Sequence, residues 1–279
     1  MTTYWKLLSF ELRRLLLPFC ILVVFTTVIQ LYNAYSKAHK AVDYANKIMK
    51  KERLTTMEQY ANAHGYFSYS DSFNQLNWII FSIFICAAFV GFYFVMIWYR
   101  DTLGRHPFMT RLLMLPSSRN NLYWAKLTAP LLIMFSLLAL QQILVPIGDS
   151  IYSSIVPSEA RQDVPLEFLI GLNPVLNILL SNSYIDFLFY YGTGITAVIV
   201  LFTVILLERS YRLYGLLAGL AYAAAAILLI AIPLFLLQSD LRYSLTEIQL
   251  TIMYFVIIAL ISGVSAWFGQ HLLAKKISI

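Results

Sequence analysis

The chain has 279 residues, of which 60% are hydrophobic and only 12% are charged. Soluble domains are about a quarter charged, so this composition excludes an ordinary soluble domain and is typical of a protein that crosses a membrane several times. The net charge is +6, and Cys20 and Cys86 both lie inside apolar runs, outside any CxxC or Cys/His pattern. We therefore expect no disulfide framework and no metal site built on cysteine.

The first residues predict an amphipathic helix over 1–14 that lies in the membrane interface and turns into the first span near Pro18. One side of this helix is apolar and the other is polar and basic. The apolar side is formed by Trp5, Leu8, Leu12 and Leu15, and the polar side by Lys6, Ser9 and Arg13.

Apolar runs long enough to cross a bilayer follow along the chain, since a crossing needs about 20 residues. We count six, which predicts an all-α polytopic membrane protein with one transmembrane domain over 1–279. The expected spans are Leu15–Tyr32, Trp78–Trp98, Leu127–Ile147, Tyr184–Leu207, Leu213–Leu237 and Ile248–Gln270.

The basic residues predict the orientation of these spans. With both termini in the cytoplasm, the inner segments hold twelve Lys and Arg residues and three acidic residues. The outer segments then hold eight Lys and Arg residues and eleven acidic residues. Because short cytoplasmic loops carry an excess of Lys and Arg, this distribution favours an N-in, C-in topology. Six of the outer basic residues lie in the first outer region, which is long enough for the rule to weaken.

That outer region is expected over 33–75. Val42, Ala45, Ile48 and Met49 recur at helical spacing, so residues 36–53 are predicted to continue the first span as an amphipathic helix. The aromatic stretch that follows, Tyr66–Tyr69 with Phe73, is interpreted either as an interfacial anchor or as a cap that contacts substrate.

A second outer loop is expected over 148–183, with short broken helices. Residues 166–180 could be taken as a seventh span, but they include Glu167, Asn173 and Pro174. A carboxylate at the centre of a span costs about 2.5–3.5 kcal/mol, and proline interrupts the helical hydrogen bonds. A seventh span would also place four basic residues on the outer side, namely Arg209, Arg212, Lys275 and Lys276.

The loop over 100–126 combines basic and apolar residues, and a short helix is predicted between Pro107 and Pro116. Apolar side chains framed by arginines suit either the groove of a partner protein or the lipid surface. A serine at 117 or 118 is a suitable N-cap for the next helix.

No set of catalytic or metal-ligating residues is recognised, so we expect no enzyme activity in this chain. There is no GxxxxGK[ST] motif and no HExxH motif, and the four histidines are far apart in the sequence. The second, third, fifth and sixth spans carry no charge in their middles, which argues against an ion-coupled carrier.

Small residues at four-residue spacing, Gly215, Gly219 and Ala223, predict close helix packing in the fifth span. Two interpretations remain open for them: packing within one subunit, and a dimer interface.

The layout of an interfacial helix, six spans and the loop RD…LLMLPSSR…YWAKL resembles the membrane subunits of bacterial ABC-2 type transporters. The resemblance implies a multi-pass protein of the bacterial plasma membrane. It also implies a cytoplasmic ABC ATPase subunit that binds ATP and Mg²⁺, and a second permease subunit, identical or different, as partners. It implies a coupling helix that contacts the ATPase through Arg105, His106, Phe108, Met109, Arg111, Leu112, Leu115 and Arg119.

The expected function is then export of a peptide, an antibiotic or another amphipathic compound across the lipid membrane by alternating access, with no cofactor in this chain and no nucleic-acid partner. The long first outer region resembles the branch of the family that exports peptides, antibiotics or ions. The alternative from another class is a membrane sensor or scaffold that binds a cytoplasmic regulator through the 100–126 loop.

Overall fold

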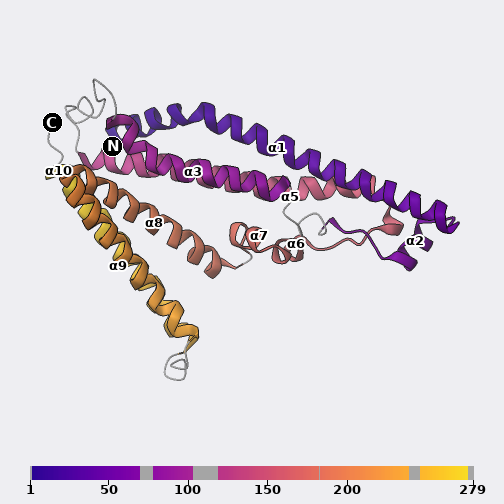
Figure 1. Ribbon diagram of the computed structural model, residues 1–279. Helices are drawn as coiled ribbons and strands as arrows, with labels where there is room; N and C mark the ends of the chain where they lie inside the picture. The colour runs from indigo at the N-terminus through magenta and orange to yellow at the C-terminus, as the bar shows by residue number, and fades with distance from the viewer. Residues whose placement is uncertain (1, 70–77, 103–118, 182, 239–245, 276–279) are drawn as a thin grey trace. The chain divides into compact units, whose positions relative to one another are not determined.

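The computed structural model describes residues 2–69, 78–102, 119–181, 183–238 and 246–275, and these are almost entirely helical (Figure 1). The elements are α1 (Thr2–Glu52), α2 (Met57–His64), α3 (Trp78–Thr102), α5 (Arg119–Ile155), the short 3-10 helix η2 (Ser158–Ala160), α6 (Leu166–Leu172), α7 (Pro174–Leu179), α8 (Tyr184–Tyr211), α9 (Leu213–Gln238) and α10 (Glu247–Lys275).

Six of the described helices, α1, α3, α5, α8, α9 and α10, are long and apolar enough to cross a membrane. The predicted all-α polytopic class with six spans is therefore confirmed. In α1, α3 and α5 the spans are parts of longer helices than the hydrophobic runs alone indicated.

Helix α1 runs from Thr2 to Glu52, so the predicted helix over 1–14 and the first span are parts of one helix, and Pro18 lies inside it. The continuation over 36–53 that helical periodicity predicted is confirmed by the end of α1 at Glu52. Helix α5 likewise includes residues 119–126 of the predicted inner loop and residues 148–155 of the predicted outer loop.

The region 166–180 does not form a seventh span. It is divided into α6 and α7 at Asn173, whose side-chain Oδ1 accepts hydrogen bonds from the backbone N–H groups of Val175 and Leu176. Asn173 is thus the N-cap of α7, and Pro174 occupies the first helical position, where its missing N–H is not needed. The predicted pair of broken helices is confirmed.

The chain divides into two compact units, and the first comprises residues 1–14, 91–131 and 188–279. Its centre holds three buried aromatic side chains, Trp98 of α3, Tyr123 of α5 and Phe202 of α8. The ring centroids of Trp98 and Phe202 are 5.6 Å apart and those of Tyr123 and Phe202 are 6.2 Å apart, both edge to face. Helices α9 and α10 run side by side in this unit (Figure 1).

The second unit comprises residues 15–90 and 132–187. In it α1, α3 and α5 share buried polar contacts: Gln30 Nε2 donates to Ser82 Oγ and to Gln141 Oε1, each at 3.0 Å. Ala34 and Ala38 are fully buried, and their small side chains leave room for Tyr69 and Tyr152 in the same apolar cluster. Burial, together with the Asp149 carboxylate, raises the pKa of the Tyr69 hydroxyl, which therefore stays protonated.

Helices α8 and α9 form a tight hairpin in the first unit. The turn between them is made by Arg212, which adopts the left-handed conformation at φ 55° and donates its N–H to the carbonyl of Glu208. A β-carbon added to Gly215 would collide with the backbone carbonyl of Leu207, and one added to Gly219 would lie 2.9 Å from Val204 Cγ1. The absence of side chains at these two positions lets α9 approach α8.

We predict opposite signs for two glycine-to-alanine substitutions. Gly215→Ala should lower the free energy of unfolding by about 1–3 kcal/mol, because backbone rather than a flexible side chain must move. Gly263→Ala in α10 should raise it by up to about 1 kcal/mol, since a β-carbon there meets nothing within 4 Å and alanine favours the helix. Thermal unfolding of both variants in the same detergent measures the difference, and equal midpoints would contradict the prediction.

Candidate functional site

Most of the predicted coupling residues lie outside the described part of the chain. Arg105, His106, Phe108, Met109, Arg111, Leu112 and Leu115 are in this group, and Arg119, the first residue of α5, is described. The structure does define both ends of the segment that holds them, because α3 ends at Thr102 and α5 begins at Arg119. Both ends lie in the first unit.

A cluster of charged side chains joins these two ends to the beginning of α1. We call it the ion cluster, and it consists of Glu11 and Arg14 from α1, Arg100 and Asp101 from α3, and Lys126 from α5. Three of its members are buried almost completely: the exposed fractions are 0% for Lys126, 1% for Asp101 and 2% for Glu11. Charges so fully removed from water are costly unless they are paired, and here each has partners.

Lys126 lies at the centre of the ion cluster. Its ammonium group donates to Glu11 Oε1 at 3.2 Å, to the carbonyl of Ile97 at 3.0 Å and to Asp101 Oδ2. An ammonium group has three N–H donors, so these three acceptors can satisfy all of them. The same group lies 5.4 Å from the centre of the Trp98 ring, which adds a cation–π contact.

The two arginines bind the outer oxygens of the same carboxylates. Arg14 Nη1 is 2.9 Å from Asp101 Oδ1, and Arg100 Nη2 is 2.9 Å from Glu11 Oε2. Arg100 also donates to the hydroxyl of Tyr93 at 2.9 Å. Three cations thus share two carboxylates, which leaves one excess positive charge in the ion cluster. Water can solvate this charge, because the side chains of Arg14 and Arg100 are each about a third exposed.

Further contacts tie both ends of the 103–118 segment to α10 and α8. Arg119 Nη1 donates to the carbonyls of Leu273 and Ala274, each at 3.0 Å, which satisfies backbone groups near the end of α10 that have no partner within the helix. On α3, Tyr99 donates to the carboxylate of Glu208 in α8, and Arg209 lies over the Tyr99 ring at 4.6 Å.

Together these contacts form a junction that joins the end of α3 and the beginning of α5 to α1, α8 and α10. Both carboxylates of the ion cluster are occupied by cations, so neither is available as a general base. Among the described residues no group of three His, Cys, Asp or Glu side chains could hold a metal ion.

The small residues of the fifth span are also placed in the first unit. Gly215 and Gly219 face α8, as described above, and Ala223 packs against a small cluster formed by Val200, Ala226 and Ile261.

Sequence reasoning counted the five members of the ion cluster as markers of topology and did not predict their pairing. A local signal was present for Glu11. It lies three residues after Leu8 and four before Leu15, on the apolar face of the first helix, and both leucines are buried. A carboxylate on such a face needs a buried cation.

Comparisons with known proteins give no further identification: no protein-family model, no curated protein and no solved structure matches the chain. The findings thus define the class of the protein, a helical multi-pass membrane protein with six spans.

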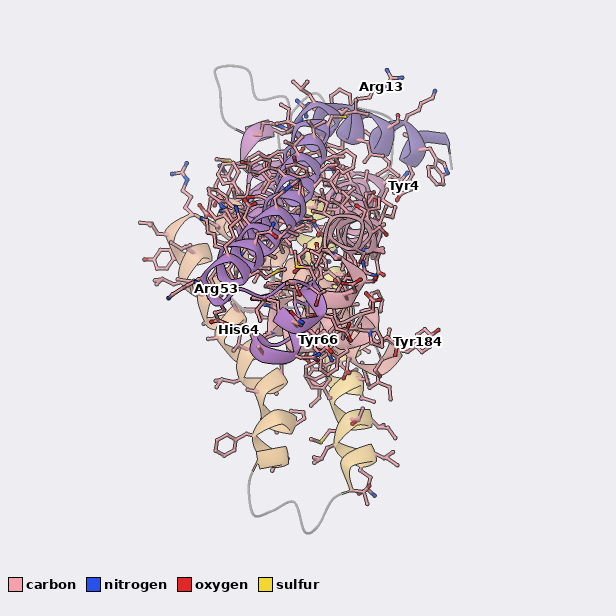
Figure 2. All side chains as sticks on the ribbon, turned by 90° about the vertical axis from the view of Figure 1, so that its right-hand side faces the viewer. Tyr4, Arg13, Arg53, His64, Tyr66 and Tyr184 are labelled. Atoms are coloured by element: carbon pink, nitrogen blue, oxygen red, sulfur yellow. The ribbon has the colours of Figure 1, made fainter. Side chains whose placement is uncertain are left out.

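We predict that Lys126→Met lowers the free energy of unfolding by about 3–5 kcal/mol, because it removes the central cation and leaves two buried carboxylates with one partner fewer. Arg13→Met is the matched control: Arg13 is exposed and points away from Tyr4 on the other side of α1 (Figure 2). Thermal unfolding in detergent should show a large loss for the first variant and little change for the second. Equal midpoints would show that the cluster is not a stabilising junction.

Proposed function

We propose that the chain is the permease subunit of an ATP-driven exporter of the ABC-2 type in the bacterial plasma membrane. It would assemble with a second permease subunit and with two cytoplasmic ATPase subunits that bind ATP and Mg²⁺. The six spans, the basic and apolar segment between the second and third of them, and the absence of a nucleotide-binding motif in the sequence support this proposal.

The observation that supports it most is the ion cluster. A segment that transmits force must be attached to the rest of the protein at rigid ends. The ion cluster holds the end of α3 and the beginning of α5, on either side of residues 103–118, through buried, hydrogen-bonded charges. An exposed loop held by solvated ion pairs would yield under load, because such pairs contribute only about 0–1 kcal/mol each.

The proposed mechanism is mechanical. ATP brings the two ATPase subunits together, their clefts displace the helix around Arg105–Leu115, and the junction passes this displacement to the attached spans. A partner can shift a two-state equilibrium only by binding one state more tightly. The apolar contact at Phe108, Leu112 and Leu115 would therefore have to tighten or reorient when ATP binds. The exported compound would be a peptide, an antibiotic or another amphipathic molecule.

The test is Leu112→Asp in the full chain, purified from its native membrane together with its bound subunits. The charge at the centre of the apolar contact should leave the chain in the membrane and uncouple ATP hydrolysis from transport, with at least about a tenfold loss of copurified ATPase. Thr110→Asp places the same charge two residues away at a position that is already polar, and should have little effect.

Mass spectrometry of the copurified subunits distinguishes the exporter from the alternative. A subunit with a GxxxxGK[ST] motif that is lost in Leu112→Asp supports the exporter. A kinase or response regulator in its place would favour a membrane sensor. Normal copurification and coupling in Leu112→Asp would show that the segment is not the coupling helix.

A further inference from the structure

The second unit contains a pocket of about 350 Å³, within the size range of small-molecule sites. We call it the Lys37 pocket, and it is lined by Lys37, Lys40, Ala41, Tyr44, Phe67, Ser68 and Tyr152. All of these residues belong to the same unit. No member of the ion cluster is among its described lining residues.

One wall of the pocket is a single face of α1, because positions 37, 40, 41 and 44 follow the helical spacing of three, four and seven residues. Phe67 and Ser68, which follow α2, and Tyr152 of α5 form the rest. The Phe67 backbone is fixed: its N–H donates to the carbonyl of Ala160 at 2.8 Å, and its carbonyl accepts from the N–H of Gln162 at 2.9 Å. The Tyr60 ring stacks on Phe67 at 5.4 Å. The pocket is therefore built on ordered backbone and packed rings.

The pocket is positively charged and partly aromatic. Lys37 and Lys40 lie one turn apart, and among the described residues neither has a carboxylate within ion-pair distance. The described lining includes no acidic residue. Two neighbouring ammonium groups on one helix face repel each other, and an anion between them relieves this repulsion. Tyr44 and Phe67 offer ring surface beside the charges, which suits an apolar body attached to the anion.

A row of polar residues on α1 leads up to the pocket, and its nearest member, Asn33, lies one turn before Lys37 and outside the pocket lining. Thr26, Gln30, Asn33, Lys37 and Lys40 succeed one another at alternating four- and three-residue spacing, which places them in one row. Thr26 contacts Cys86 Sγ at 3.2 Å, and Gln30 is bonded on two sides. Asn33 is only 4% exposed, and its Nδ2 has no hydrogen-bond partner. A buried amide without a partner costs about 1–3 kcal/mol and calls for a bound polar group or water.

We propose that the Lys37 pocket binds a phosphate ester with an apolar or aromatic body. Lys37 and Lys40 hold the phosphate, since lysines act as point charges for phosphate groups, and Tyr44 and Phe67 contact the body. The lysines lie about 8–12 Å along α1 beyond Tyr32, the expected end of the first span, at 1.5 Å per residue. At that level the phosphate could belong to a lipid headgroup or to a soluble compound. The site does not depend on the exporter mechanism.

The first experiment measures binding of 1-naphthyl phosphate to the full chain in nanodiscs of phosphatidylcholine. We expect inorganic phosphate and 1-naphthol to bind about tenfold more weakly, because each supplies only half of the recognised chemistry. The double variant K37Q/K40Q should lose about tenfold in affinity for the naphthyl phosphate. The double variant K47Q/K50Q has the same spacing and charge change on exposed positions of the same helix, and should bind as the wild type does.

The second experiment distinguishes the two sources by comparing the phosphatidylglycerol retained after extraction from mixed vesicles. Retention by the wild type and loss from K37Q/K40Q identify a lipid headgroup as the occupant. Equal retention by both proteins, with naphthyl phosphate bound tightly by the wild type alone, identifies a soluble phosphate ester. The proposal would be overturned if K37Q/K40Q and K47Q/K50Q bound naphthyl phosphate equally well. It would also be overturned if the wild type bound 1-naphthol and 1-naphthyl phosphate equally well.

Discussion

The first unit depends on the burial of charge where helix ends meet. Lys126, Asp101 and Glu11 are almost completely removed from water, and such charges are tolerated only when each has close partners. Lys126 of α5 contacts both Glu11 of α1 and Asp101 of α3, so the requirement fixes these three helices relative to one another within the unit. The aromatic core around Phe202 and the hydrogen bonds from Arg119 to α10 extend this fixed region.

The two proposals place different chemistry in the two units. In the first unit the charges are paired and buried, which favours rigid transmission of a displacement and disfavours binding of a further ion. In the second unit Lys37 and Lys40 are left without described carboxylate partners, which favours an anionic ligand. Lysine thus has two roles in these proposals. Lys126 forms buried ion pairs that hold helices together, and Lys37 and Lys40 bind an anionic ligand.

Local chemistry was readable from the sequence and long-range pairing was not. The six spans follow from apolar length, and the break between α6 and α7 follows from Asn173 and Pro174, since capping and a missing N–H act within a few residues. The ion cluster joins residues that are 25 to 115 positions apart, and no local pattern specifies which cation meets which carboxylate. The Lys37 pocket was equally hidden, because it needs Phe67 and Tyr152 to meet α1.

The division into two units has a consequence for how the long helices can deform. The boundary cuts α1 after Arg14, α3 before Gly91 and α5 after Leu131. Pro18 has no N–H to donate to the Arg14 carbonyl, and Pro130 lies next to the boundary in α5. Gly91 lacks a side chain, and of the amino acids only proline favours the helix less. Each of these three helices therefore carries, beside its own boundary, a residue that disfavours helical structure, so each helix is locally less rigid at that position than along the rest of its length.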